Sequence, residues 1–169
     1  MKFAHLKAAF VGTVFAAAAF GSTAAQAATA DADARATILA ALTVTNATDL
    51  DFGTIAVNGG GSVTVTNAGV RAATTGGTVS PAGVAAAASF AIVGAPGSNI
   101  LITVPASVIL DHATTTDSMS ASLTTNAPTV AHPLVGGAEI FNVGGTLTVA
   151  AGQVAGAYTG TFAVTVEYQ

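Results

Sequence analysis

The chain has 169 residues, 51% of them hydrophobic, and a formal net charge of −4. Two of its four cations lie in an N-terminal leader, so the rest of the chain carries about −6. Such an acidic chain has no basic surface for nucleic acid, and an anionic membrane would repel it. It also has no cysteine, so no disulfide can stabilise it outside the cytoplasm.

Residues 1–27 have the three parts of a secretory signal peptide. Lys2 and Lys7 give a positive start, residues 8–20 form an apolar run, and an A-x-A cleavage site follows at Ala25-Gln26-Ala27. The apolar run is shorter than the ~20 residues that a transmembrane helix needs. We therefore expect export through the periplasm and a mature chain without a membrane span, located outside the cell or on its surface.

Residues 28–37 form an arm in which apolar and polar side chains alternate strictly, as they do along a β-strand that has one apolar face. Nearly all the apolar side chains are alanine, and each buried methyl contributes only about 0.8 kcal/mol. Such a segment is stable only when it joins a sheet that already exists. We expect it to act as a donor strand whose inward residues are Ala30, Ala32, Ala34, Ala36 and Ile38. A frayed tail, or an ordinary first strand of its own domain, remains an alternative.

Residues 38–169 have a β pattern throughout, with glycine- and proline-rich segments between the strands. This predicts an all-β fold, an antiparallel β-sandwich or a β-barrel. Residues 38–44 should belong to its core, Val143-Gly144-Gly145 should break a strand, and residues 80–89 form either a helical turn or a loop. We expect strands at 38–45, 51–57, 62–66, 77–80, 89–93, 100–104, 108–110, 118–125, 140–143, 146–149 and 158–168.

The polar residues that could carry chemistry do not form a recognisable site. Asp49 and Asp51 should point outward from a strand that buries Leu50 and Phe52, whereas calcium needs six to eight oxygen ligands from a loop. The pattern therefore indicates two solvated carboxylates.

The two histidines of the mature chain, His112 and His132, also lack the context of a catalytic site. No G-x-S-x-G motif accompanies them, and the adjacent Asp111 and His112 would point to opposite faces of a strand. His112, Asp117 and His132 do not follow the spacing of metal ligands. We predict no catalytic residue, no metal and no cofactor, and we do not predict an enzyme.

The C-terminal segment, residues 158–168, alternates like the arm but carries large side chains on one face. A strand with such a face is expected beside the groove that would accept a donated strand, where main-chain bonds give affinity and side-chain pockets give specificity. The large inward residues that we assign to this edge are Phe162, Val164, Val166 and Tyr168.

Two long stretches carry a family resemblance: ATILAALTVTNATDLDFGTIAV, and FNVGGTLTVAAGQVAGAYTGTFAVTVEYQ at the end. They resemble the bacterial family known as domain of unknown function 4402 over nearly the whole mature chain. The plan is also similar to that of fimbrial subunits of chaperone–usher pili, including the archaic spore-coat type. Leu50, Phe52 and Gly53 match an L-x-F-G motif, and Gly156 and Tyr168 match a glycine and a penultimate tyrosine of the last strand.

The second resemblance implies an immunoglobulin-like sandwich that lacks its last strand. A periplasmic chaperone would supply that strand first, and the arm of the next subunit would replace it by donor-strand exchange at an outer-membrane usher. The chain departs from many pilins in having no disulfide and in its alanine-rich arm.

Two functions therefore remain open. The first is a structural subunit of a surface filament, a fimbria or pilus, whose partners are copies of itself or related subunits; Gly156 joins the C-terminal edge in this assembly. The second is a monomeric adhesion or binding sandwich with a ligand site in its loops, around residues 111–117 or 132–137.

Overall fold

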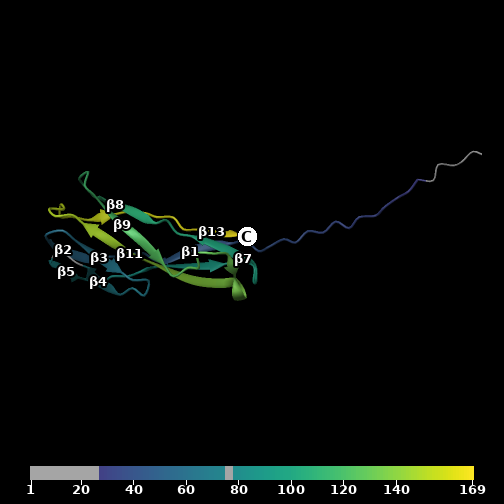
Figure 1. Ribbon diagram of the computed structural model, residues 1–169, viewed down its shortest axis with the longest axis horizontal. Coiled ribbons are helices and arrows are strands. Elements are labelled where there is room, and N and C mark those ends of the chain that lie inside the picture. The colour runs from purple at the N-terminus through teal and green to yellow at the C-terminus, as the bar shows by residue number, and fades with distance from the viewer. Residues whose placement is uncertain (1–26, 75–77) are drawn as a thin grey trace, which may run out of the picture. The chain divides into compact units, whose positions relative to one another are not determined.

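The computed structural model describes residues 27–74 and 78–169, and it is an antiparallel β-sandwich, as predicted (Figure 1). The predicted signal peptide lies outside the described residues, except for Ala27. A short 3₁₀ turn, η1, covers Val135–Gly137. The strands are β1 (Thr43–Thr48), β2 (Thr54–Asn58), β3 (Gly61–Val65), β4 (Arg71–Thr74), β5 (Thr78–Ala82), β6 (Ala88–Val93), β7 (Asn99–Thr103), β8 (Ser107–His112), β9 (Ser118–Thr125), β10 (His132–Pro133), β11 (Ala138–Val149), β12 (Tyr158–Thr159) and β13 (Thr165–Tyr168).

The chain divides into two units, Met1–Ala36 and Thr37–Gln169. The second unit, called the body below, contains all of these strands. Within the described part of the first unit, residues 27–36 form no strand and every side chain is exposed. Across residues 27–74 and 78–169, no helix has the length and apolar character needed to cross a membrane.

The strands of the body pair antiparallel in three sheets. The largest runs β1-β6-β11-β9-β8-β12, with β3 attached to β11 and β4 attached to β3; the others are β10-β7-β13 and β2-β5. The long strand β11 organises the first sheet, because it pairs with β6 and then β3 along one edge and with β9 along the other.

The prediction that Val143-Gly144-Gly145 breaks a strand was wrong, because both glycines lie inside β11. A Cβ atom added at Gly144 would collide with the carbonyl oxygen of Val65, and one at Gly145 would lie 2.7 Å from that of Ser122. Glycine is needed here because β3, β11 and β9 approach one another closely, and not because the chain turns.

The expected strand at 38–45 begins late, and the expectation that residues 38–44 belong to the core was wrong. Ile38 is 95% exposed and Leu39 is 47% exposed, and β1 begins only at Thr43, where pairing with Val93 of β6 starts. The residues before Thr43 have no paired strand in the described chain, so only Leu42 packs against the core.

Two further segments differ from the expected pattern. Residues 80–89 form no helical turn, since β5 continues to Ala82 and Ala86 forms a bridge with Asp51. The expected strand at 158–168 is divided into β12 and β13.

The core consists of two buried clusters. One centres on Phe90, Phe141 and Ile92, with the first two rings stacked at 5.4 Å. The other centres on Val63, Val65 and Leu147. Phe162 packs against both clusters and meets Phe90 edge-on at 6.0 Å, so the C-terminal segment covers the seam between them.

Candidate functional site

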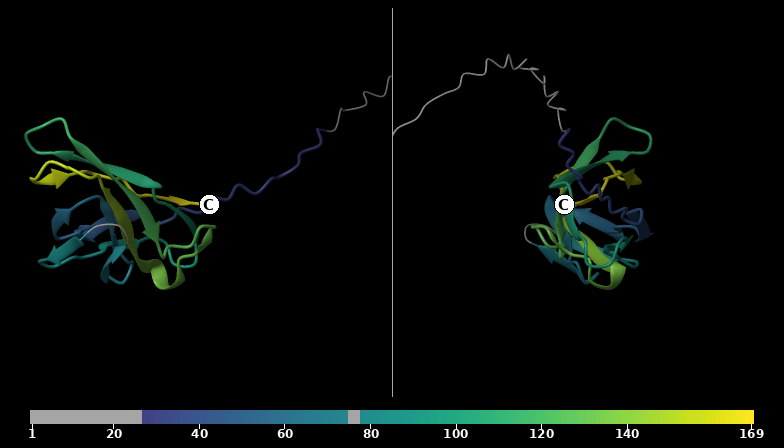
Figure 2. Two further views of the ribbon diagram at one scale, coloured as in Figure 1. Left: turned by 60° about the vertical axis from the view of Figure 1, so that its left-hand side comes forward. Right: turned by 90° about the vertical axis from the view of Figure 1, so that its right-hand side faces the viewer.

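The candidate site begins with an unpaired edge at the C-terminus of the body. Tyr158 and Thr159 of β12 pair with β8, and residues 165–168 of β13 pair with β7, so residues 158–168 follow these two strands (Figure 2). Both β12 and β13 are the last members of their sheets, and within the described residues no strand pairs with their outer side. We call residues 158–168 the C-terminal edge. A free row of backbone N–H and C=O groups is a template for an added strand.

The apolar face of this edge covers the core only in part. Four of its inward side chains pack against the buried clusters yet remain partly exposed, and these are the residues that the sequence assigned to the edge: Phe162, Val164, Val166 and Tyr168. Gly160 holds the edge close to β8, because an added Cβ would collide with the backbone carbonyl oxygen of Ile109.

One end of the edge is tightly closed around Tyr168. Its hydroxyl accepts a hydrogen bond from the Ala95 amide at 2.6 Å and donates one to the Ala40 carbonyl at 3.0 Å. A Cβ added at the neighbouring Gly94 would meet this hydroxyl and would lie 2.8 Å from Leu42. The segment that leads into β1 and the end of β13 therefore touch, and only glycine fits at position 94.

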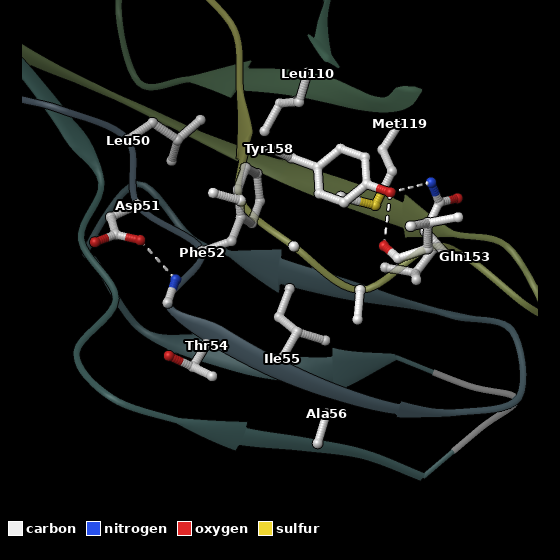
Figure 3. Close-up of a pocket in the computed structure, with 16 residues that line it drawn as sticks. Leu50, Asp51, Phe52, Thr54, Ile55, Ala56, Leu110, Met119, Gln153 and Tyr158 are labelled. Carbon is white, nitrogen blue, oxygen red and sulfur yellow. Dashed lines mark hydrogen bonds between the residues drawn. The ribbon is translucent and has the colours of Figure 1, made fainter. Parts of the chain in front are cut away.

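The opposite end of the edge opens into a pocket of about 660 Å³ (Figure 3). Residues 50–56 form one wall, residues 153–158 form another, and Leu110 and Met119 complete it from β8 and β9. Figure 1 shows β2, whose Thr54 and Ile55 line this pocket, at the end of the body away from β13. Among the lining residues that the structure describes, Asp51 is the one charged group, and its carboxylate accepts the Gly53 amide at 2.7 Å.

The L-x-F-G motif builds the first wall of this pocket. Phe52 is 7% exposed and anchors the wall in the second core cluster, while Leu50 packs against both clusters. Gly53 turns the chain with a φ of 72°, a conformation that glycine adopts without strain. Asp49 and Asp51 are exposed and Leu50 and Phe52 face inward, which confirms the alternation predicted for this segment.

Tyr158 and His112 hold the second wall. The Tyr158 hydroxyl accepts a hydrogen bond from the Gln153 side chain at 2.8 Å and donates one to the Val154 carbonyl at 2.7 Å. The His112 ring meets the Tyr158 ring edge-on at 4.9 Å.

His112 has a structural role here. Its Nδ1 accepts the amides of Thr114 and Thr115 at 3.2 and 3.1 Å, so the ring hydrogen lies on Nε2, which donates to the Ala155 carbonyl at 3.2 Å. Gly156 lies against the same ring, which leaves no space for a Cβ there. Glycine at position 156 therefore lets the His112 ring pack against the backbone.

The remaining polar candidates do not line the pocket. His132 on β10 pairs with Glu139 on β11, with 2.7 Å between Nε2 and Oε2. The Asp117 carboxylate accepts the Thr115 hydroxyl at 2.6 Å. In the described part of the chain, no three histidine, aspartate or glutamate side chains are placed to hold a metal ion.

The predicted donor residues of the arm, Ala30, Ala32, Ala34 and Ala36, are exposed, as is Ile38 at the start of the body. An ion pair joins Arg35 and Asp33 at 2.9 Å, with both side chains more than 80% exposed. The arm therefore has its apolar face open to solvent.

The fold and site define a cysteine-free β-sandwich module with an unpaired edge and a pocket at one end of it. The family model described as "Domain of unknown function (DUF4402)" matches residues 42–168, so the chain belongs to that family. The match starts at Leu42, so the arm lies outside it. No curated protein and no solved structure matches the chain.

Proposed function

We propose that this protein is a structural subunit of a bacterial surface filament, a fimbria or pilus, assembled by strand donation. The arm of one copy adds to the C-terminal edge of another. The observation that carries the proposal is the unpaired edge above partly exposed core side chains, a surface to which a further strand could be added.

The chemistry of the arm fits that edge. Its backbone bonds to the edge contribute roughly 0.5–1.5 kcal/mol each, and its period of two directs every alanine toward the core while the charged residues face solvent. The side chains of residues 27–36 are exposed, so nothing must be displaced before they bind. In addition, the body has no disulfide, and an added strand would stabilise it.

Donation of a strand joins two different surfaces, the arm of one subunit and the edge of the next. Such a head-to-tail contact does not close on itself and grows into a filament. The same free edge would need protection during export, because unpaired strands aggregate. A periplasmic chaperone and an outer-membrane usher, which the resemblance to chaperone–usher subunits implies, are the partners that we propose for this stage.

The test is deletion of residues 28–37 from the exported protein. We expect folded, secreted monomer and no polymer, because the body retains its whole core while the donor strand is gone. Electron microscopy and sedimentation velocity measure the outcome. Polymer that persists in the deletion would refute strand donation, and a wild-type protein that stays monomeric at all concentrations would favour the monomeric adhesion module.

Trypsin provides a second readout on the intact protein. The mature chain offers two cleavage sites, at Arg35 in the arm and Arg71 in β4. Arg35 is 86% exposed, so trypsin should cut it readily in monomer, and pairing of the arm should protect it in polymer. Equal cleavage at Arg35 in monomer and polymer would contradict the proposal.

A further inference from the structure

The largest sheet has a gap along one edge of β11. On that edge β6 pairs with β11 as far as Val143, and β3 pairs with it from Gly145 onward. Gly144 lies between the two and has no partner in either strand, so its amide donates to the Asn67 side-chain oxygen at 3.0 Å. The turn that follows β3 therefore closes the gap with a carboxamide side chain.

The turn holds this carboxamide in one orientation. Gly69 has a φ of 75°, and its amide donates to the Thr66 carbonyl at 2.8 Å. Because the Gly144 amide is a donor, Asn67 must direct its side-chain oxygen toward it, and the same oxygen accepts the Thr124 hydroxyl at 3.2 Å. Within the described residues, the N–H groups of the Asn67 side chain have no partner and remain available to a ligand.

A second carboxamide, that of Asn142 on β11, lines the same space. Phe141 and Val143 on either side of it are buried in the core, so the Asn142 side chain lies on the outer face of the sheet. Its amide donates to the Asn126 side-chain oxygen at 2.7 Å, and its carbonyl accepts the Thr125 hydroxyl at 3.0 Å. These bonds fix the backbone, while the side-chain amide has no partner among the residues that the structure describes.

The two carboxamides border a pocket of about 370 Å³, which we call the asparagine pocket. The rest of its lining is small: Ala68 and Gly69 from the turn after β3, and the three alanines at 85–87 that lead into β6. None of the lining residues that the structure describes is charged, so a charged ligand would lose its hydration there without gaining an ion pair.

We propose that the asparagine pocket binds one ring of an uncharged sugar. A carboxamide offers a donor and an acceptor side by side, and neighbouring sugar hydroxyls do the same. The alanine methyls would pack against the C–H face of the ring. A volume near the lower end of the range for small-molecule sites suits one ring. An added peptide strand fits less well, because β6 and β3 already occupy this edge of β11 on both sides of the gap.

This site goes beyond strand donation, since it shares no residue with the C-terminal edge or with the pocket at the end of that edge. It also differs from the loops at 111–117 and 132–137, where the sequence suggested a ligand site. In a filament each subunit would carry one such pocket. A glycan-covered surface would then be held with an avidity well above the affinity of a single pocket.

Saturation-transfer NMR on the mature protein tests the site in monomer and polymer alike. The probes are the methyl glycosides of glucose, galactose and mannose, with methyl glucuronide as the charged control. We expect transfer to at least one neutral glycoside, strongest at the C–H protons of one ring face, and less to the glucuronide. Asn142→Ala should weaken binding about tenfold through lost hydrogen bonds. Asn99→Ala, which removes an exposed carboxamide outside the pocket, should leave binding unchanged.

A second variant fills the pocket without removing a side-chain hydrogen bond. Ala68 is exposed on its turn, so Ala68→Trp should fold normally and abolish binding. Absence of transfer from all three neutral glycosides would overturn the inference, as would binding that survives both Asn142→Ala and Ala68→Trp. Stronger transfer to the glucuronide would contradict an uncharged ligand. Transfer to N-acetyl-trialanine amide and to none of the glycosides would replace the sugar with a peptide.

Discussion

Replacing Ile38 with alanine should weaken assembly without weakening the fold. The substitution removes three carbon atoms, and at about 0.8 kcal/mol each their burial contributes about 2.4 kcal/mol. This corresponds to a loss of about 60-fold in the association constant of each subunit contact. Ile38 is 95% exposed in the free chain, so the free energy of unfolding should change by less than about 0.5 kcal/mol.

Sedimentation velocity across a concentration series measures the association constant, and urea unfolding of dilute monomer measures stability. Val84→Ala is the matched control, since Val84 is 84% exposed and lies outside both the arm and the edge. An association constant within twofold of wild type would refute the donor role of Ile38. A destabilised monomer would show that Ile38 contributes to its own body, contrary to its exposure.

Three further substitutions test the body. Phe141→Ala removes a ring that is 1% exposed, and it should lower the free energy of unfolding by about 3–5 kcal/mol in urea; a loss below about 1 kcal/mol would contradict its place in the core. Tyr168→Phe deprives the Ala95 amide of its acceptor, so it should cost about 1–3 kcal/mol and speed hydrogen exchange at Ala95; unchanged exchange would count against this bond. Gly144→Ala should cost about 1–3 kcal/mol by forcing β3 away from β11, while Ser120→Ala on the exposed face of β9 leaves stability unchanged; equal unfolding midpoints for the two would disprove the close approach.

The alternation of apolar and polar side chains along the sequence was sufficient to predict many of the strands of the sandwich. The strand at 118–125 was predicted with its observed bounds, because one face of β9 buries Ala121 while Ser118 and Ser120 remain exposed. The interpretation of glycine as a strand breaker failed at Gly144 and Gly145. Glycine in a turn and glycine at a close approach of three strands look alike in sequence.

Ile38 shows a second limit of the pattern. An isoleucine in a period-two segment is read as a core residue, but burial depends on whether a neighbouring strand reaches that position. Pairing of β1 with β6 stops at Thr43, so the side chain stays in solvent.

Only one side of the candidate site has a visible signal in the sequence. The C-terminal edge residues were visible as a run of large alternating side chains, and in the structure Phe162, Val164, Val166 and Tyr168 pack, partly exposed, against the core. The pocket could not be predicted, because its walls come from segments around residues 50, 110–119 and 150 that are distant in sequence. The L-x-F-G motif was the part of the pocket that the sequence made recognisable. Nothing in the sequence around Met119 or Gln153 indicates a cavity.

The hydrogen bond between the Tyr168 hydroxyl and the Ala40 carbonyl has a mechanical consequence for such a filament. It makes each chain enter its sandwich at the end far from the pocket, so successive subunits would stack lengthwise and tension would run along the donated strand. A load in that direction shears all the main-chain bonds of the joint together, instead of unzipping them one after another. The continuous backbone of each chain and the hydrogen bond of Tyr168 would thereby let a filament without disulfide cross-links resist pulling.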